Sequence, residues 1–318
     1  MKEELYDIAI VGGGPAGLTA GLYARRADMK TVLIERYVPG GQVLLTDRIE
    51  NYPGFPDGIT GSELAERIKE QACKIGLTIE QDSIALIQEE KYKDVKRTFK
   101  LITEDSGEYN ALSIIFAAGA TWKHLDVPGE EKFAGRGVSY CATCDGPMFR
   151  NKKVVVVGGG DKAVEEGIYL AKFASEVTVV HRRDRLRAAK ILQEALTKNN
   201  KIKLCLNSII SSIEGDKVVS GVKVKNTRDG AEKDIPCQGV FVFVGIEPNS
   251  ALLKNKVKLS DDGYILTDGD MQTSAEGIFA CGDVRKKSLQ QIVMATGEGA
   301  QAAISAQRYV ENLKGTAY

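Results

Sequence analysis

The chain has 318 residues and a formal net charge of zero, because its 43 lysines and arginines balance its 43 aspartates and glutamates. This length predicts two domains, and the balanced charge argues against a nucleic-acid partner. No apolar run approaches the ~18 residues that a membrane span requires, and the first residues show no signal-peptide pattern. We therefore expect a cytoplasmic protein with no membrane partner.

A glycine-rich turn follows the first apolar segment of the chain. Residues 8–17 read IAIVGGGPAG, a predicted strand that runs into a GxGxxG pattern, and helical spacing follows. Such a turn lets the backbone approach a pyrophosphate and places the phosphates at a helix N-terminus. The next apolar segment, residues 31–34, ends at Glu35, whose carboxylate suits the two hydroxyls of a ribose. The pattern predicts a site for a dinucleotide with a free 2′-hydroxyl, either FAD or NAD.

Two cysteines, Cys141 and Cys144, stand two residues apart, and Asp145 follows them. A CxxC pair closes a small, reducible disulfide in which one sulfur is commonly the more acidic, and a neighbouring carboxyl group can move a proton. Half of a zinc site or a structural disulfide would give the same pattern, and Asp145 would serve equally well as the cap of a following helix. The position of the pair between two nucleotide-binding motifs favours redox chemistry.

A second glycine-rich turn repeats the first. Residues 154–163 read VVVVGGGDKA, and the apolar segment 177–180 is followed by a histidine and arginines where the first repeat has Glu35. A carboxylate there would repel a 2′-phosphate, whereas guanidinium groups bind one through charge-assisted hydrogen bonds. The second turn therefore predicts an NADPH site, the alternative being a solvated basic loop. Its expected contacts are Gly158, Gly160, Asp161, Lys162, His181, Arg182, Arg183 and Arg187.

The order and spacing of these motifs resemble those of the low-molecular-weight, bacterial-type thioredoxin reductases, over nearly the whole chain. The shared elements are both glycine-rich turns, the CATCD sequence at 141–145, the HRR sequence at 181–183 and the GDV sequence at 282–284. The resemblance implies an α/β fold with two Rossmann-like, three-layer ββα domains.

The two repeats also predict how the domains are joined. Residues 1–117 and 249–318 would form a discontinuous FAD-binding domain, and residues 118–248 an inserted NADPH-binding domain that carries the CxxC pair. Rotation of the inserted domain about the two crossings would let one flavin face serve both NADPH and the dithiol.

The resemblance further implies the activity, NADPH-dependent reduction of the thioredoxin disulfide by a homodimeric enzyme. Electrons would pass from NADPH through FAD to the Cys141–Cys144 disulfide and then to thioredoxin. Cys144 would face the flavin, Cys141 would attack the partner, and Asp145 would donate and accept the proton. The FAD contacts expected from the first turn and from the resemblance are Gly12, Gly14, Pro15, Ala16, Gly17, Glu35, Gly40, Gly41, Gln42, Asn51, Ile84, Gly119, Gly282, Asp283, Gln291 and Ile292.

Alternatives in the same class are ferredoxin-dependent and peroxiredoxin-linked flavoprotein disulfide reductases. The first lack the basic cluster after residue 180, and the second usually add an N-terminal thioredoxin-like region. From other classes, the alternatives are an FAD- and NADPH-binding flavoprotein that does not act on thioredoxin, and a zinc-binding module. A single cysteine pair without a nearby histidine argues against zinc.

Several further positions carry expectations. Lys162 stands where the family usually has Ser or Thr, and Gln290 stands where it usually has Arg. Pro147-Met148 stands where many relatives have aromatic residues. We expect His124 to be an ordinary surface-loop residue. The remaining cysteines, expected to be small buried residues, are Cys73, Cys205, Cys237 and Cys281.

Overall fold

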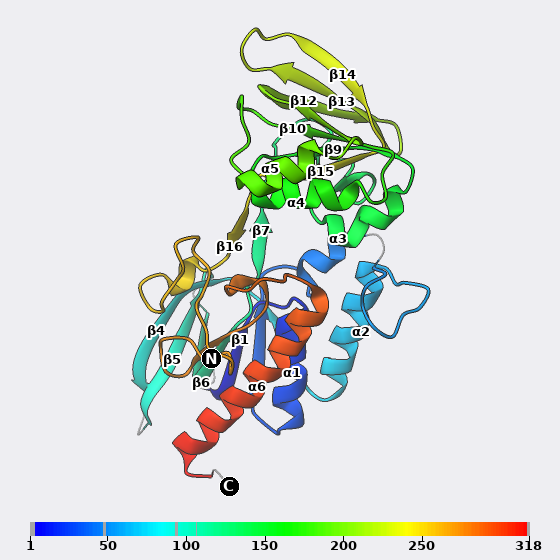
Figure 1. Ribbon diagram of the computed structural model, residues 1–318. Coiled ribbons are helices and arrows are strands. Elements are labelled where there is room, and N and C mark those ends of the chain that lie inside the picture. The colour runs from blue at the N-terminus through cyan, green and yellow to red at the C-terminus, as the bar shows by residue number, and fades with distance from the viewer. Residues whose placement is uncertain (1–3, 47–48, 93–94, 106, 317–318) are drawn as a thin grey trace. The chain divides into compact units, whose positions relative to one another are not determined.

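The computed structural model describes residues 4–46, 49–92, 95–105 and 107–316. The chain divides into two compact units, each of which carries one glycine-rich turn (Figure 1). The first unit comprises Met1–Thr46, Tyr52–Thr121 and Glu247–Tyr318, and the second comprises Asp47–Asn51 and Trp122–Ile246.

The first unit is built on one sheet with the strand order β3-β2-β1-β6-β5-β4, in which β17 also pairs with β6. Strands β3, β2, β1, β6 and β17 are parallel, and β4 and β5 continue the sheet in antiparallel fashion. Helices α1 and α6 pack side by side against this sheet (Figure 1). The elements are β1 (Leu5–Val11), α1 (Pro15–Arg26), β2 (Thr31–Glu35), α2 (Gly61–Lys74), β3 (Thr78–Gln81), β4 (Ile84–Tyr92), β5 (Val95–Thr103), β6 (Glu108–Phe116), β17 (Ile278–Ala280) and α6 (Ile292–Lys314), with single-turn helices η1 (Gly41–Leu45), η3 (Ala251–Leu253) and η4 (Gly282–Val284).

The apolar residues of β1 explain why this sheet is covered on both faces. Successive side chains of a strand point to opposite faces. Ile8 and Ile10 join the core beneath the helices, whereas Ala9 and Val11 join a second core on the other face. A fully buried Ile contributes about 1.5–3 kcal/mol of hydrophobic stabilisation, so a run without polar residues favours a central strand. The glycine turn therefore starts from a rigid strand.

The second unit has three layers. A parallel sheet in the order β11-β10-β9-β15-β8 lies between helices on one face and the antiparallel sheet β12-β13-β14 on the other. Alternate valines of β9 divide between the two cores: Val154 and Val156 face the helices, and Val155 and Val157 face the antiparallel sheet. The elements are β8 (Val138–Ser139), α3 (Ala142–Asp145), β9 (Lys153–Val157), α4 (Asp161–Leu170), β10 (Glu176–Val180), α5 (Lys190–Thr197), β11 (Ile202–Cys205), β12 (Ser208–Gly215), β13 (Val219–Asn226), β14 (Glu232–Pro236) and β15 (Gly239–Val242), with the single-turn helix η2 (Gly146–Phe149).

The long central segment of the second unit is joined to the first unit at residues 121–122 and 246–247. The strands at these crossings, β7 (Ala120–Trp122) and β16 (Ile246–Pro248), pair with each other as a two-stranded sheet. In the first unit, Asn249 reinforces the crossing, because its backbone and side-chain amides donate to the carbonyls of Gly119 and Ala118.

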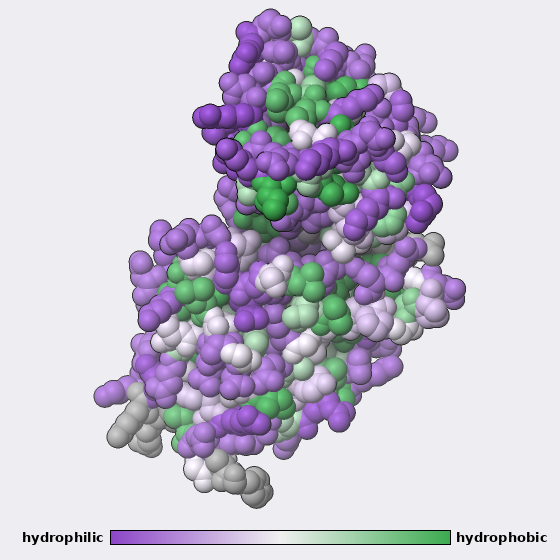
Figure 2. All heavy atoms as spheres, in the orientation of Figure 1, coloured by the Kyte–Doolittle hydropathy of each residue, from purple (hydrophilic) through white to green (hydrophobic). Residues whose placement is uncertain are grey.

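Hydrophilic residues cover most of the face that Figure 2 shows. Within the described part of the chain, no helix is both long and apolar enough to cross a membrane.

Candidate functional site

The first glycine turn joins β1 to α1 and leaves open space at the helix N-terminus. Gly12 has φ +105°, and a Cβ there would press on the backbone of Ala117 and Ala118, so this position requires glycine. At Gly14, by contrast, a Cβ would meet nothing within 4 Å. Pro15 is the first residue of the helix. The backbone N–H that proline lacks would have no partner within the helix at this position, so its absence costs no hydrogen bond. The unpaired amides of the first helical turn therefore face a space that can hold a phosphate.

Glu35, at the end of β2, is tied to this turn. Its Oε2 accepts a 2.6 Å hydrogen bond from the amide of Gly13, and its Oε1 accepts one of 2.9 Å from the amide of Tyr37. A cavity of about 250 Å³ lies beside the carboxylate and is also lined by Tyr37, Val38 and Lys69. Because each carboxylate oxygen can accept a further hydrogen bond, the arrangement fits a ribose with two free hydroxyls.

Other residues expected to bind FAD gather around the same turn. The amide of Gly40 donates to the carbonyl of Gly13 at 2.8 Å, and Gly41 lies against Gly14. Gly282 lies beside Ala16 on α1, where any side chain would collide. These contacts bring segments far apart in the sequence to one helix N-terminus.

The remaining expected FAD contacts are more scattered. Gln42 donates its side-chain amide to the carbonyl of Ala120, and Ile292 is the first residue of α6, after Gln291 at its N-cap. Ile84 is 8% exposed, in the core that also contains Val11. Asn51 falls in the second unit, unlike the other residues of this set.

Glu298 on α6 is a residue of this region that sequence reasoning missed. Its carboxylate is buried and accepts hydrogen bonds from the amide of Gly282 and from Arg285, both at 2.8 Å, and from Lys287 at 3.3 Å. Lys287 also lies 2.9 Å from Oδ1 of Asp283. This network of buried charges holds the loop that presents Asp283. A single acidic residue in a run of small ones, Gly297-Glu298-Gly299, was the available signal.

The second glycine turn repeats the geometry of the first. Gly158 has φ +150°, and Gly160 faces open space at the N-terminus of α4. Asp161, the first residue of that helix, accepts a 2.7 Å hydrogen bond from the amide of Ala189. Lys162 follows it and is exposed. The turn thus offers a second phosphate-sized space at a helix N-terminus.

His181 occupies the place that Glu35 has in the first unit, but its side chain is buried. A Cβ at Gly159 would collide with its ring, so the imidazole lies directly under the turn. Burial lowers the pKa of His181, and the positive charges of Arg187, Arg182 and Arg183 lower it further. The ring is therefore neutral at pH 7.

The three arginines of the basic cluster are exposed. The backbone amide of Arg187 donates a 2.6 Å hydrogen bond to the carbonyl of Gly159, which ties the cluster to the turn. The arrangement places guanidinium groups, rather than a carboxylate, at the edge of the second turn.

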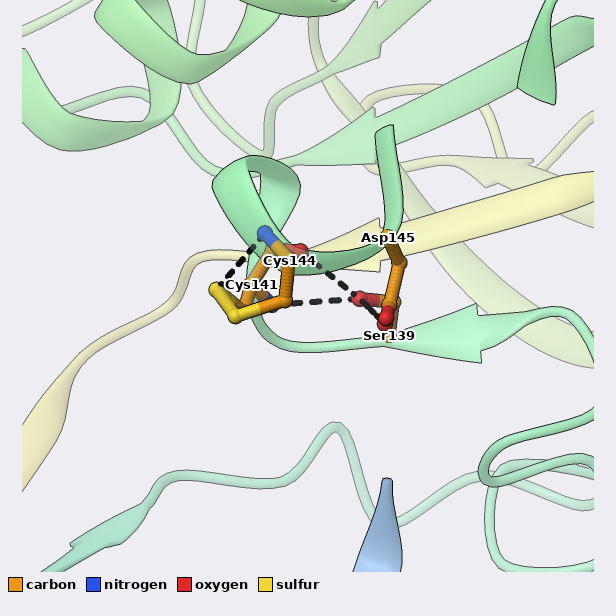
Figure 3. The surroundings of a disulfide bond; sticks show 4 residues. All are labelled: Ser139, Cys141, Cys144 and Asp145. Carbon is orange, nitrogen blue, oxygen red and sulfur yellow. Dashed lines mark hydrogen bonds between the residues drawn. A yellow bond between two sulfur atoms is a disulfide. The ribbon is translucent and has the colours of Figure 1, made fainter. Parts of the chain in front are cut away.

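Cys141 and Cys144 form a disulfide at the start of α3 (Figure 3). Cys141 is the N-cap of this short helix, and its sulfur accepts a hydrogen bond from the amide of Cys144 at 3.2 Å. Asp145 accepts a 2.6 Å hydrogen bond from the hydroxyl of Ser139. Its carboxylate makes no capping hydrogen bond to η2, the helix that follows, so the structure gives no support to a capping role.

The residue before the disulfide also belongs to a polar cluster. The ring of Tyr140 stacks on Trp122, and its hydroxyl donates a 2.9 Å hydrogen bond to the buried carboxylate of Glu130. Burial, together with that carboxylate, raises the pKa of Tyr140. His124 is exposed, as expected, but its Nδ1 lies 2.9 Å from the Tyr140 hydroxyl. Glu130 and Tyr140 were not expected from the sequence.

Of the other four cysteines, three are buried and Cys73 is exposed. The expectation for Cys73 was wrong, because α2 is amphipathic and buries Leu64, Ala65 and Ala72 instead. Among the residues that the structure describes, no group of three or more His, Cys, Asp or Glu side chains is placed to hold a metal ion.

Comparison with known proteins agrees with this arrangement. Residues 6–299 match the family described as pyridine nucleotide-disulphide oxidoreductase. The chain is 48% identical to the thioredoxin reductase of Listeria monocytogenes, covering 98% of this chain and 96% of that one. It is 46% identical to the thioredoxin reductase of Bacillus subtilis, covering 99% and 98%.

Solved structures give the same result. The thioredoxin reductase from Streptococcus pyogenes has a TM-score of 0.91 with 45% identity, over 97% of this chain and 99% of that one. The Lactococcus lactis thioredoxin reductase has a TM-score of 0.64 with 44% identity, over 96% and 99%. Together with the disulfide and the two nucleotide-type turns, these similarities show that the chain belongs to the bacterial thioredoxin reductases of the pyridine nucleotide-disulphide oxidoreductase family.

Proposed function

We propose that this enzyme carries FAD in its first unit, takes electrons from NADPH in its second, and reduces thioredoxin through Cys141 and Cys144. The observation that carries the proposal is the disulfide, closed at the start of a helix in a chain with two nucleotide-type turns. The relatives that bear the name thioredoxin reductase support the choice of partner.

FAD fits the first unit on the chemistry of its residues. The amides after Gly14 suit the pyrophosphate, Glu35 suits the ribose hydroxyls, and Asp283 is held where it can accept from further hydroxyl groups. The amide of Ile292, at the N-terminus of the 23-residue α6, would favour negative charge on a ring placed against it. When bound, FAD supplies a two-electron carrier between a nicotinamide and a disulfide.

NADPH, rather than NADH, is the proposed electron donor. The exposed guanidinium groups of Arg182, Arg183 and Arg187 suit the 2′-phosphate that distinguishes the two nucleotides. The His181 ring packs against Gly159 of the turn, so the arginines are the residues proposed to bind the phosphate. Lys162 adds a further positive charge beside the helix N-terminus.

The dithiol carries out two exchange steps. The Cys141 thiolate attacks one sulfur of the thioredoxin disulfide, which forms a mixed disulfide and releases one partner thiolate. The Cys144 thiolate then attacks the Cys141 sulfur, which re-forms the internal disulfide and releases the second partner thiolate. The two protons of the reduced enzyme dithiol pass to the two partner thiolates. Asp145 is the proposed carrier of these protons.

The domain boundaries at residues 117 and 249, the rotation of the inserted domain, the homodimer and the cytoplasmic location remain predictions. They rest on the duplicated motif and on the resemblance to this family. The two crossing strands, β7 and β16, are the segments about which such a rotation would take place.

Trapping of the partner tests the assignment of the two sulfurs. With a thioredoxin that lacks its resolving cysteine and carries thionitrobenzoate in disulfide linkage on the remaining one, Cys144→Ser should displace thionitrobenzoate and accumulate a mixed disulfide through Cys141, and Cys141→Ser should not. Cys73→Ser is the matched control, because Cys73 is exposed but lies outside the site. A complex formed equally by both site variants would contradict the assignment.

A further inference from the structure

One hydroxyl group lies at the centre of the redox loop. Ser139, only 5% exposed, is the last residue of strand β8. Its Oγ makes hydrogen bonds with Cys141, at the start of the dithiol segment, and with Asp145, just after its end. It accepts a 3.1 Å hydrogen bond from the amide of Cys141, and it lies 2.6 Å from Oδ2 of Asp145 and 3.2 Å from the carbonyl oxygen of Cys141. Figure 3 shows Ser139 beside the Asp145 carboxylate, with the two sulfur atoms at the opposite end of the group.

The two sides of this contact differ in how firmly they are held. Ser139 lies in the parallel sheet of the second unit, where β8 pairs with β15 through Ser139 and Phe241. Asp145 ends a four-residue helix that carries the disulfide. A helix this short gains little stability from its own hydrogen bonds. The Ser139 hydroxyl therefore links the carboxylate to the rigid part of the unit.

A hydroxyl has one proton to donate and two lone pairs with which to accept. When Asp145 is ionised, Ser139 donates to Oδ2. When Asp145 carries a proton, the acid can donate to Ser139 Oγ, and the Ser139 proton can turn to the carbonyl of Cys141. Both protonation states of the carboxyl group are thus hydrogen-bonded without movement of any heavy atom.

We propose that Ser139 is a positioning residue that holds Asp145 in place through each proton transfer of the dithiol cycle. The proposal rests on the proposed role of Asp145 as proton carrier. Each turnover delivers two protons to the partner thiolates, so Asp145 must lose and regain a proton while the loop is rearranged. Loss of the hydroxyl would remove this hydrogen bond from both protonation states of the carboxyl group.

The test compares Ser139→Ala, Ser139→Thr, Asp145→Asn and the double variant Ser139→Ala/Asp145→Asn in the FAD-loaded enzyme. Thioredoxin reduction by NADPH gives kcat and KM, and stopped-flow absorbance gives flavin reduction by NADPH. The control is Ser250→Ala, because Ser250 is 6% exposed and also donates a 2.6 Å hydrogen bond, to the carbonyl of Gly263.

Ser139→Ala should lower kcat roughly tenfold, the scale of a hydrogen bond to a charged group, with KM for thioredoxin and flavin reduction unchanged. Ser139→Thr, which keeps the hydroxyl, should recover most of the rate. Asp145→Asn should slow turnover by roughly 10²–10⁴-fold, and adding Ser139→Ala to it should cost less than about twofold more. Ser250→Ala should behave as the unchanged enzyme.

The outcomes separate the two proposals. An unchanged rate in Ser139→Ala beside a slow Asp145→Asn would overturn the role of Ser139 alone. A full tenfold loss from Ser139→Ala in the Asp145→Asn background would do the same, because Ser139 would then act on something other than Asp145. An unchanged rate in Asp145→Asn would overturn the role of Asp145 and, with it, this inference.

Discussion

The backbone amide of Gly13 donates a 2.6 Å hydrogen bond to the carboxylate of Glu35. At the corresponding place of the second turn, Gly159 lies against the buried ring of His181. The same strand–turn–helix therefore occurs in both units. A carboxylate contacts the turn in the first unit, and a neutral imidazole ring flanked by exposed arginines contacts it in the second. This difference is the physical basis for assigning different nucleotides to the two units.

Replacing Glu35 should weaken FAD binding. Glu35→Ala removes the acceptor for the ribose hydroxyls and for the Gly13 amide, so the dissociation constant for FAD should rise at least about tenfold. Fluorescence titration of the apoprotein with FAD measures this constant. Glu70→Ala, at an exposed position of α2, should leave it unchanged. An unaltered constant in Glu35→Ala would remove the carboxylate from the FAD site.

Replacing the basic cluster should change nucleotide preference. In Arg182→Ala/Arg187→Ala, kcat/KM for NADPH should fall by roughly 10²–10⁴-fold, since each of the two lost contacts with a phosphate contributes about 1.5–3 kcal/mol. The value for NADH should stay nearly constant, because NADH has no 2′-phosphate. The exposed Arg136 supplies the control, Arg136→Ala. Parallel losses for both nucleotides would mean that the cluster supports the fold instead.

The ion pairs of Glu298 and Glu276 differ in burial, so they should differ in how much they contribute to the free energy of unfolding. Glu298→Gln leaves Arg285, which is 14% exposed, without its carboxylate, and removes one of the two carboxylates beside Lys287, which is 6% exposed. Loss of one partner of a buried pair costs about 3–5 kcal/mol, whereas loss of an exposed one costs about 0–1 kcal/mol. Glu298→Gln should therefore lower the melting temperature by several degrees, and Glu276→Gln, which loses an exposed contact with Arg97, should barely change it. Calorimetry that found equal shifts would contradict the structural role of Glu298.

His181 should make the fold sensitive to mild acid. Its pKa is lowered in the folded protein, so from about pH 6.5 down to that lowered pKa the unfolded chain binds more protons than the folded one. Stability contributed by the neutral ring is thus present above pH 6.5 and is lost as the pH falls. The charges that lower the pKa of His181 are those of Arg187, Arg182 and Arg183. Between pH 7 and 5.5, His181→Asn should lose fewer degrees of melting temperature than the unchanged protein, and an equal loss would contradict this account.

The local parts of the fold and site follow from the sequence. The strand–turn–helix around Gly12 and that around Gly158 are predictable because short-range apolar patterns and glycine conformations determine them. The Cys141–Cys144 disulfide is predictable for the same reason, since two intervening residues bring the sulfurs within reach.

Contacts that depend on tertiary packing were not predictable. Glu298 reaches Gly282 only because α6 packs beside α1, and Ser139 reaches Asp145 only because the loop after β8 folds back on itself. The sequence places His181 directly after an apolar strand, as β10 shows, but the burial of its ring beneath Gly159 was not predictable, because a sequence pattern does not determine where the ring points.

The most direct test of the electron path is anaerobic mixing of FAD-loaded enzyme with thioredoxin and with either NADPH or NADH, while thioredoxin thiols are counted. NADPH should yield one reduced thioredoxin disulfide for each nucleotide oxidised, and NADH should react far more slowly. Cys141→Ser should still show flavin reduction by NADPH but form no thioredoxin thiols. Thiols produced by Cys141→Ser, or produced equally well from NADH, would contradict the path from NADPH through Cys141 and Cys144 to thioredoxin.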